Sequence, residues 1–110
     1  MDGTLRPWAD ATVHVLSHSL QRGSLVFDYM SVHDLPEENG AGLPAGATLF
    51  RMREHIERFF HSCELMGLPL EQDASLMREA IRETVRANPG AKAVKISAYF
   101  SSIEIDVVPV

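Results

Sequence analysis

The sequence predicts a two-layer α+β fold, in which two helices cover an antiparallel sheet. Residues 24–32 and 93–110 are rich in the β-branched and aromatic residues that favour strands. Residues 53–87 instead carry apolar residues at helical spacing, in two stretches. The expected order is strand, strand, helix, helix, strand, strand, which favours an antiparallel sheet with the helices in a second layer.

The first predicted strand is SLVFDYMSV, residues 24–32. Strand alternation places Phe27 and Tyr29 on one face, and Val26, Asp28 and Met30 on the other. Both faces are largely apolar, so we expect both to be covered. Residues 33–47 are rich in glycine and proline and predict a loop, which leads into a short second strand at TLF, residues 48–50.

The segment before the first strand contains little regular structure in this prediction. Residues 1–12 are polar and include Pro7 and Trp8, which favours an irregular or short edge segment. Ser17 and Gly23 bracket a single helical turn, with Ser17 as its N-cap.

Two helices follow the second strand. The first runs from about Arg53 to Met66 and ends before Gly67. The second has Asp73 as its N-cap and ends near Asn88. Two strands then close the chain, AVKISAYFS at 93–101 and IEIDVVPV at 103–110.

Composition excludes several classes of protein. The chain has 110 residues and a formal net charge of -5, and its ten Lys and Arg residues are scattered, which argues against nucleic-acid binding. It contains no apolar stretch of the roughly 20 residues that a membrane span requires. One cysteine and the absence of a signal-peptide pattern in the first residues predict a cytoplasmic protein.

The first predicted helix contains His55, His61 and Cys63, which suggest a metal site. On a helix His55 and His61 point in different directions, and His55 and Cys63 are about 12 Å apart along the axis. Zinc needs ligands about 2.3 Å from one point, so we expect no metal site here. Cys63 shares the apolar face with Phe59 and Phe60, where a thiol behaves as a small hydrophobic group.

Charged residues on the same helix predict two pairs at i,i+4 spacing, Arg53 with Glu57 and Glu54 with Arg58. Arg58 also lies beside the apolar seam, with Ser62 one turn further on. A guanidinium held in this way suits a phosphate or carboxylate. The spacing therefore leaves two interpretations of Arg58, an exposed ion-pair partner and an anion-binding residue.

Several stretches in order resemble the N-terminal small domain of the fold-type IV (class IV) pyridoxal-phosphate enzymes. They are DATVHVLSHSLQRGSLVFDYMSV, the glycine-rich loop, LFRMREHIERFFHSCELMGLP and VRANPGAKAVKIS. The chain is most similar to the branched-chain aminotransferases, and D-amino-acid aminotransferases and aminodeoxychorismate lyases are relatives. The resemblance covers nearly the whole chain.

The resemblance implies roles for particular residues. A helix arginine of this family binds the phosphate of pyridoxal 5'-phosphate, and the matching residue is Arg58, with Ser62 at the small polar position. Phe27 and Tyr29 share a strand face, which leaves two interpretations, residues that line the substrate side chain and residues that belong only to the core. The resemblance implies that elements near Arg22, a further candidate for substrate binding, reach the site of a neighbouring subunit. Arg22 replaces a usual aromatic residue, and Asp28 and Tyr29 stand where Glu and Gly are usual. The family's Tyr-Ile-Arg-Pro aligns with Val94 to Ser97.

The resemblance also implies what this chain lacks. The family's catalytic lysine lies on a large C-terminal domain, and neither Lys92 nor Lys95 matches it. We therefore expect residues 1–110 to be the small domain of a homodimeric aminotransferase acting on an apolar amino acid and a 2-oxo acid, and to be inactive alone. The chain stops at Val110 in strand-like sequence, which suggests a fragment. The alternative is a non-catalytic interaction domain with the same fold.

Overall fold

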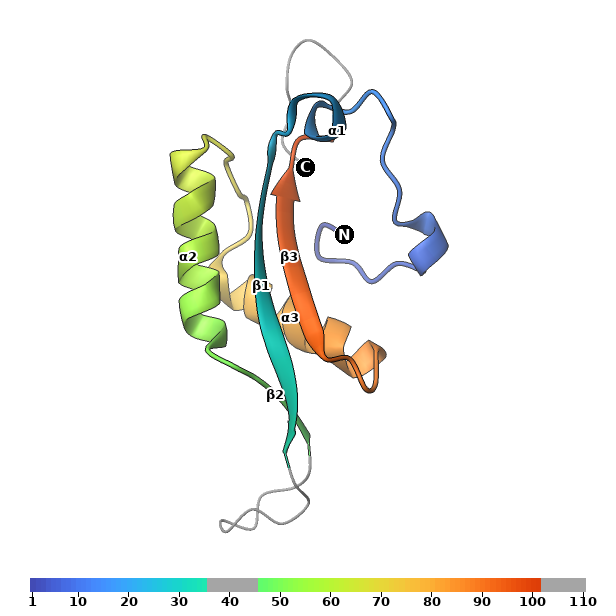
Figure 1. Ribbon diagram of the computed structural model, residues 1–110, viewed down its shortest axis with the longest axis vertical. Coiled ribbons are helices and arrows are strands. Elements are labelled where there is room, and N and C mark those ends of the chain that lie inside the picture. The colour runs from blue at the N-terminus through green and yellow to red at the C-terminus, as the bar shows by residue number, and fades with distance from the viewer. Residues whose placement is uncertain (36–45, 102–110) are drawn as a thin grey trace.

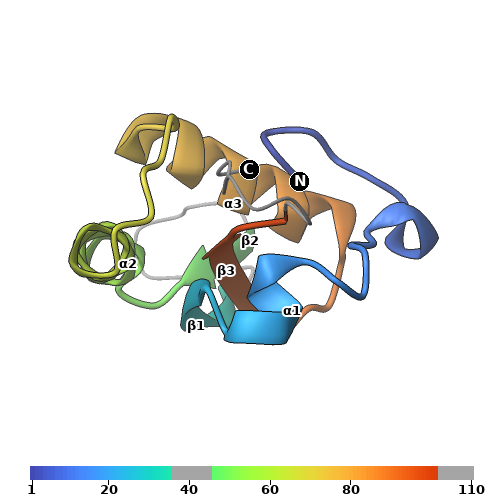
Figure 2. The same ribbon diagram turned by 90° about the horizontal axis from the view of Figure 1, so that it is seen from above.

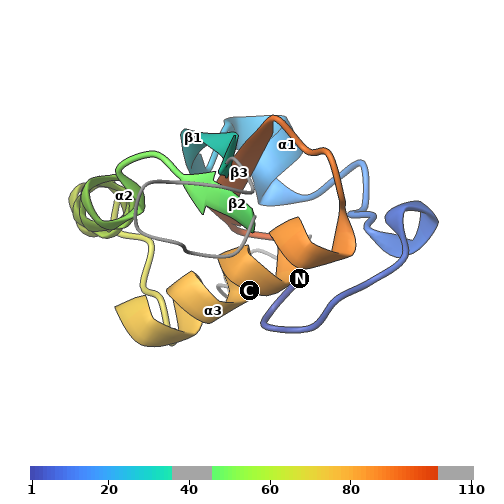
Figure 3. The same ribbon diagram turned by 90° about the horizontal axis from the view of Figure 1, so that it is seen from below.

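The computed structural model describes residues 1–35 and 46–101, which form a sheet covered on one face by two helices (Figure 1). The sheet has three strands in the order β2-β1-β3, and both pairings are antiparallel. Helices α2 and α3 lie on the same side of the sheet, as the views along its length show (Figures 2 and 3). The elements are η1 Trp8–Asp10, α1 His18–Arg22, β1 Leu25–Leu35, β2 Gly46–Leu49, α2 Met52–Leu65, α3 Ala74–Ala87 and β3 Ala93–Tyr99.

Strand β1 is the centre of the sheet. It pairs with β3 from Leu25 to Ser31 and with β2 only from Val32 to Leu35. The part of β1 before Ser31 therefore has no described strand on its second edge. Helix α2 runs beside this edge (Figure 1), so side chains of α2 can reach residues of β1 there.

The hydrophobic core lies between the sheet and the two long helices. Strand alternation directs Val26 and Met30 of β1 toward the helices, together with Ile96 and Ala98 of β3. The helices and the turn between them contribute the rest of this buried cluster, which is Ile56, Phe59, Cys63, Leu68 and Ile81. Helical spacing in α2 therefore produces one buried stripe, as the sequence predicts.

The opposite face of β1 is exposed, and here the prediction of two covered faces is wrong. The Phe27 and Tyr29 side chains are 55% and 58% exposed, and Leu25 is also exposed. Helices α2 and α3 pack on the other side of the sheet, so neither of them covers this aromatic row. Apolar residues on both faces occur in strands that are covered on both sides and also in strands that are exposed on one side, so the sequence pattern does not distinguish the two.

Helix α1 connects the N-terminal segment to the sheet. It begins after Ser17 and ends at Gly23, whose φ of 68° is the left-handed conformation that glycine adopts without strain. Ser17 is the N-cap by position, although its side chain makes no capping hydrogen bond; its Oγ lies 3.1 Å from the Ser19 Oγ. The Ser19 N–H donates to the Phe100 carbonyl, which fixes α1 at the end of β3.

The structure confirms most of the predicted elements. Helices α2 and α3 lie within one or two residues of their expected ends, and Asp73 accepts a hydrogen bond of 2.9 Å from the Leu76 N–H as the N-cap of α3. Strand β1 extends to Leu35, into the predicted loop. The middle of that loop, 36–45, and the predicted strand at 103–110 lie outside the described residues. No helix in 1–35 or 46–101 is long and apolar enough to span a bilayer.

Candidate functional site

Arg58 lies on α2, between the buried residues Ile56 and Phe59. Because these two residues fix the helix against the sheet, Arg58 is directed along the free edge of β1 instead of away from the molecule. Its side chain is 65% exposed, so the guanidinium remains accessible to solvent and to a ligand.

The partner of Arg58 is Asp28, in the middle of β1. Nε of Arg58 donates to Oδ2 of Asp28 over 2.7 Å, and Nη2 donates to Oδ1 over 2.8 Å. This two-point contact aligns the guanidinium plane with the carboxylate plane and is among the stronger arrangements for an ion pair. The predicted pairing of Arg58 with Glu54 is therefore wrong, since Glu54 lies 3.7 Å from Arg51. A largely desolvated carboxylate attracts the arginine more strongly than an exposed one on the same helix.

Asp28 is a buried acid whose hydrogen-bonding capacity is well satisfied. Its side chain is only 3% exposed, because strand alternation directs it toward α2. Besides the two bonds from Arg58, its Oδ1 accepts 2.8 Å hydrogen bonds from the Tyr29 N–H and from His55. A carboxylate with four donors can remain charged inside a protein, where an unpaired one could not.

The geometry also assigns the proton on His55. Nδ1 of His55 lies 2.8 Å from Oδ1 of Asp28 and 3.3 Å from Nη2 of Arg58. The carboxylate can only accept, so at the shorter of the two distances Nδ1 carries a proton and donates it to Asp28, and the longer contact with Nη2 then brings two donors together and is not a hydrogen bond. Two elements, α2 and β1, thus place an acid, a base and a cation together.

The neighbouring donors change the ionisation of Asp28. Arg58 has the largest effect, and together with His55 and the Tyr29 N–H it holds the pKa of the Asp28 carboxyl far below its usual range, although burial alone would raise it. In return, the hydrogen bond from Asp28 raises the pKa of Arg58. Both shifts favour the ionised forms of Asp28 and Arg58.

Arg58 retains donors that no described residue uses. Asp28 occupies Nε and one N–H of Nη2, while Nη1 makes no hydrogen bond with the part of the chain that the structure describes. A guanidinium that is exposed, fixed in orientation and has two unused N–H groups on Nη1 fits the oxygens of a phosphate. The anion-binding interpretation of Arg58 is thus geometrically consistent, and the phosphate contact itself stays a prediction. Ser62, one turn further along α2, is half-buried.

Phe27 and Tyr29 lie on the opposite face of β1 from Asp28. The register pairs Phe27 with Ser97 and Tyr29 with Lys95 across β1 and β3. Nζ of Lys95 lies 4.2 Å from the centroid of the Phe27 ring, a cation–π distance. The exposed face therefore presents two aromatic rings and one ammonium group, while the free edge beside it carries Arg58.

The remaining predicted positions are not part of this cluster. Arg22 lies in the last turn of α1 and is exposed. Val94 and Ile96, which align with the tyrosine and arginine of the family's Tyr-Ile-Arg-Pro, face the core, and Ile96 is buried. They cannot contact a ligand on the aromatic face. In this strand Lys95 and Ser97 occupy the exposed positions.

Metal and thiol chemistry have no support at this site. No group of three or more potential metal ligands is present within 1–35 and 46–101. Cys63 is 2% exposed in the core, where burial raises the pKa of its thiol. His14 accepts a hydrogen bond at Nδ1 from the Leu16 N–H over 3.0 Å.

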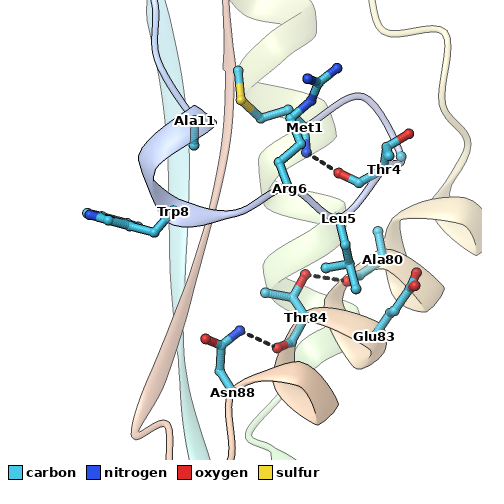
Figure 4. Close-up of a pocket in the computed structure, with 11 residues that line it drawn as sticks. Met1, Thr4, Leu5, Arg6, Trp8, Ala11, Ala80, Glu83, Thr84 and Asn88 are labelled. Atoms are coloured by element: carbon cyan, nitrogen blue, oxygen red, sulfur yellow. Dashed lines mark hydrogen bonds between the residues drawn. The ribbon is translucent and has the colours of Figure 1, made fainter.

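A cavity of about 350 Å³ lies elsewhere, between the N-terminal segment and α3 (Figure 4). Leu5 of the segment and Ala80 of α3 are among its lining residues. The polar contacts there are internal to each element, such as Thr84 Oγ1 donating to the Ala80 carbonyl over 2.7 Å. None of the predicted site residues lines this cavity, and Glu83 and Arg6 are its only charged side chains among the described residues. It has no arrangement suited to catalysis.

Comparison with known proteins connects this geometry to a family. No model of a protein family matches the sequence. The branched-chain-amino-acid aminotransferase of Pseudomonas aeruginosa is 36% identical over 87 residues, which are 79% of this chain. This chain is homologous to branched-chain-amino-acid aminotransferases. The similarity covers only 26% of the Pseudomonas enzyme, so the chain spans about a quarter of the length of that relative.

Solved branched-chain aminotransferases share the fold of this homologue. The enzyme from the archaeon Thermoproteus uzoniensis, solved with norvaline, has a TM-score of 0.80 and 34% identity, over 96% of this chain and 33% of its own. The T.th. enzyme, complexed with N-(5'-phosphopyridoxyl)-L-glutamate, has a TM-score of 0.81 and 27% identity, over 94% of this chain and 33% of its own. The predicted α+β fold and the predicted relationship are both confirmed.

Proposed function

We propose that this chain is the small domain of a pyridoxal-phosphate-dependent aminotransferase that transfers an amino group between an apolar, branched-chain amino acid and a 2-oxo acid. The observation that carries the proposal is Arg58, an exposed guanidinium with free Nη1 donors on a helix shared with the homologues. A solved relative carries a phosphopyridoxyl group together with an amino acid. The homology to branched-chain enzymes favours that substrate class over D-amino acids or aminodeoxychorismate.

Each residue of the site has a distinct role in this proposal. The bound cofactor supplies an electron sink for charge developed at the α-carbon of an amino acid. Arg58 binds its phosphate by charge-assisted hydrogen bonds, and Ser62 lines the same side of α2. The exposed rings of Phe27 and Tyr29 face an apolar substrate side chain, and Arg22 lies near the substrate entrance.

The proposal places the catalytic lysine outside this chain. A nucleophilic lysine needs a lowered pKa and a position at the reacting carbon. Lys92 and Lys95 match no such position, and Lys95 lies beside the Phe27 ring. We propose that the lysine belongs to a large C-terminal domain of a longer protein, which also covers the aromatic face of β1. The 110-residue chain would then be inactive alone.

The assembly and compartment are further parts of the proposal. A homodimer with elements near Arg22 close to the neighbouring subunit follows from the family resemblance. A cytoplasmic setting is favoured by the one cysteine, Cys63, which is free and buried. Sedimentation of a longer protein containing this chain would test the oligomeric state.

A chimeric enzyme tests the function. This chain would replace the matching quarter of the Pseudomonas aeruginosa aminotransferase, and transfer from leucine to 2-oxoglutarate and cofactor retention during gel filtration would both be measured. We expect transamination and retained cofactor. Arg58→Ala should weaken cofactor binding by about tenfold or more, through loss of charge-assisted bonds. Arg53→Ala is the matched control, because Arg53 is also an exposed arginine of α2 and its side chain, among the described residues, pairs with Glu57 and not with Asp28.

The results separate the proposal from an interaction domain that has kept only the fold. The uncovered Phe27 and Tyr29 suit either function, since a protein partner could also cover them. A folded chimera that retains no cofactor favours the interaction domain. Equal cofactor retention in the Arg58→Ala and parent chimeras removes Arg58 from the site.

A further inference from the structure

We propose that Asp28 is a positioning residue for phosphate binding, which fixes Arg58 through Nε and Nη2 and leaves Nη1 to contact the phosphate. This inference rests on the proposed function, and it adds a residue and an atom assignment to it. Asp28 accepts two hydrogen bonds from Arg58, the candidate for phosphate binding, at 2.7 Å from Nε and 2.8 Å from Nη2.

Asp28 restricts the conformational freedom of the Arg58 side chain. An arginine side chain has many rotamers, and a ligand that must order them binds less tightly. A two-point contact to Asp28 defines the plane and the direction of the guanidinium before a ligand arrives. The unused N–H groups of Nη1 then lie at one place on the free edge of β1.

Asp28 is itself held rigidly. Its backbone lies in the paired part of β1, opposite Ile96 of β3, and its side chain is buried. His55 Nδ1 and the Tyr29 N–H both hold Oδ1 at 2.8 Å, so the carboxylate cannot rotate without losing them. Positioning therefore runs from His55 through Asp28 to Arg58.

A simple charge argument predicts the opposite role. Asp28 carries a negative charge close to a bound phosphate, and Coulomb repulsion alone would make its removal favourable for phosphate binding. If Asp28 is a positioning residue, removal of its carboxylate instead weakens phosphate binding, because the Arg58 guanidinium is then no longer held in one orientation. The sign of the change in affinity decides between these two roles.

The Asp28→Asn variant tests whether removal of the Asp28 charge weakens or strengthens phosphate binding. The amide keeps the size of the side chain, removes the charge and offers one oxygen where the two arginine nitrogens need two. The probe is pyridoxamine 5'-phosphate, which lacks the aldehyde that would react with lysines, and pyridoxamine is the control without phosphate. We expect the ratio of the two affinities, measured by calorimetry on the cofactor-free chimera described above, to fall about tenfold in Asp28→Asn.

Glu57→Gln is the matched control for loss of a carboxylate. Glu57 precedes Arg58 on α2, its side chain pairs with Arg53, and among the described residues it makes no hydrogen bond or ion pair with Arg58. We expect no change in the affinity ratio for this variant. A rise in the ratio for Asp28→Asn, or equal values for that variant and the parent, overturns the positioning role.

A second measurement uses the parent chimera and so does not depend on whether the variant folds. In ¹⁵N NMR spectra, the Arg58 Nε–H proton should exchange slowly with water, because it is bonded to Asp28. It should stay in place when pyridoxamine 5'-phosphate is added, while Nη1 signals shift. Disappearance or a large shift of the Nε–H signal would mean that phosphate displaces Asp28, which also overturns the proposal.

The two proposals fail in different ways. If the parent chimera binds pyridoxamine 5'-phosphate and pyridoxamine equally, the proposed function fails and this inference fails with it. If Arg58→Ala abolishes the phosphate preference and Asp28→Asn leaves it unchanged, only the positioning role fails.

Discussion

Arg58 and Asp28 are separated by 30 residues in sequence and joined by two hydrogen bonds of 2.7 and 2.8 Å. The contact is asymmetric, because the arginine side chain is 65% exposed and the aspartate side chain is 3% exposed. Loss of the contact would return Arg58 to water at little cost but leave Asp28 in the interior. The stability of this pair is therefore governed mainly by the state of the aspartate.

Acid should destabilise the chain through Asp28. Its carboxyl has a pKa near 3.9 when unfolded, and Arg58 lowers the folded pKa far below that. The stabilisation is then fully present above about pH 5 and is lost as the pH falls from there toward the folded pKa. We expect the free energy of unfolding, from urea titrations at pH 6, 4 and 3, to fall more steeply in the parent than in Asp28→Asn.

Parallel curves for the two proteins would contradict a role for Asp28 in acid stability. Glu57→Gln is again the control, because its ion pair with Arg53 is exposed on both sides. That variant should show the same pH dependence as the parent.

Local patterns predicted the elements of the fold well, because each element follows from a few neighbouring residues. The period of Ile56, Phe59 and Cys63 defines the buried stripe of α2, and Asp73 marks the start of α3. The error at β1 has a different origin. An apolar residue such as Phe27 favours burial, but sequence does not say whether the covering surface belongs to the same chain.

The site was predictable only in part. Arg58 stands out from its place beside the apolar seam, whereas for Asp28 the sequence predicts a strand position and a departure from the family pattern but no role in the site. A signal for it did exist, since alternation places Asp28 with Val26 and Met30 on the core face. A buried carboxylate needs charged or hydrogen-bonding partners. The cation that pairs with Asp28 is determined by how α2 packs along β1. The spacing of residues within α2 does not predict this long-range contact.

Cys63 should react with thiol reagents only when the core opens. It is 2% exposed, and burial raises its pKa, so both access and thiolate content are low in the folded state. We expect its reaction with Ellman's reagent to be on the order of a hundredfold or more slower than in urea-unfolded chain. Reaction at the unfolded rate under native conditions would show that α2 does not pack stably on the sheet.

Truncating Ile81 tests whether α3 is part of the same core. Ile81 is buried in the cluster shared by α2, α3 and the sheet. Ile81→Ala should therefore lower the free energy of unfolding by about 2 to 5 kcal/mol, from lost transfer energy and the cavity left behind. Leu76→Ala on the same helix is the control, because Leu76 is exposed, and we expect a change within about 0.5 kcal/mol. Similar losses in both variants, measured by urea denaturation, would contradict this packing.

Asp73 should stabilise α3 through its side-chain oxygen. Its Oδ1 accepts the Leu76 N–H at 2.9 Å, one of the N–H groups that has no partner within the helix. Asp73→Ala removes this acceptor, and we expect a loss of about 1 kcal/mol in the free energy of unfolding. Asp73→Asn keeps an oxygen in the same place and should change the free energy far less. Equal losses in both variants would show that the charge at the start of α3 contributes more than the hydrogen bond.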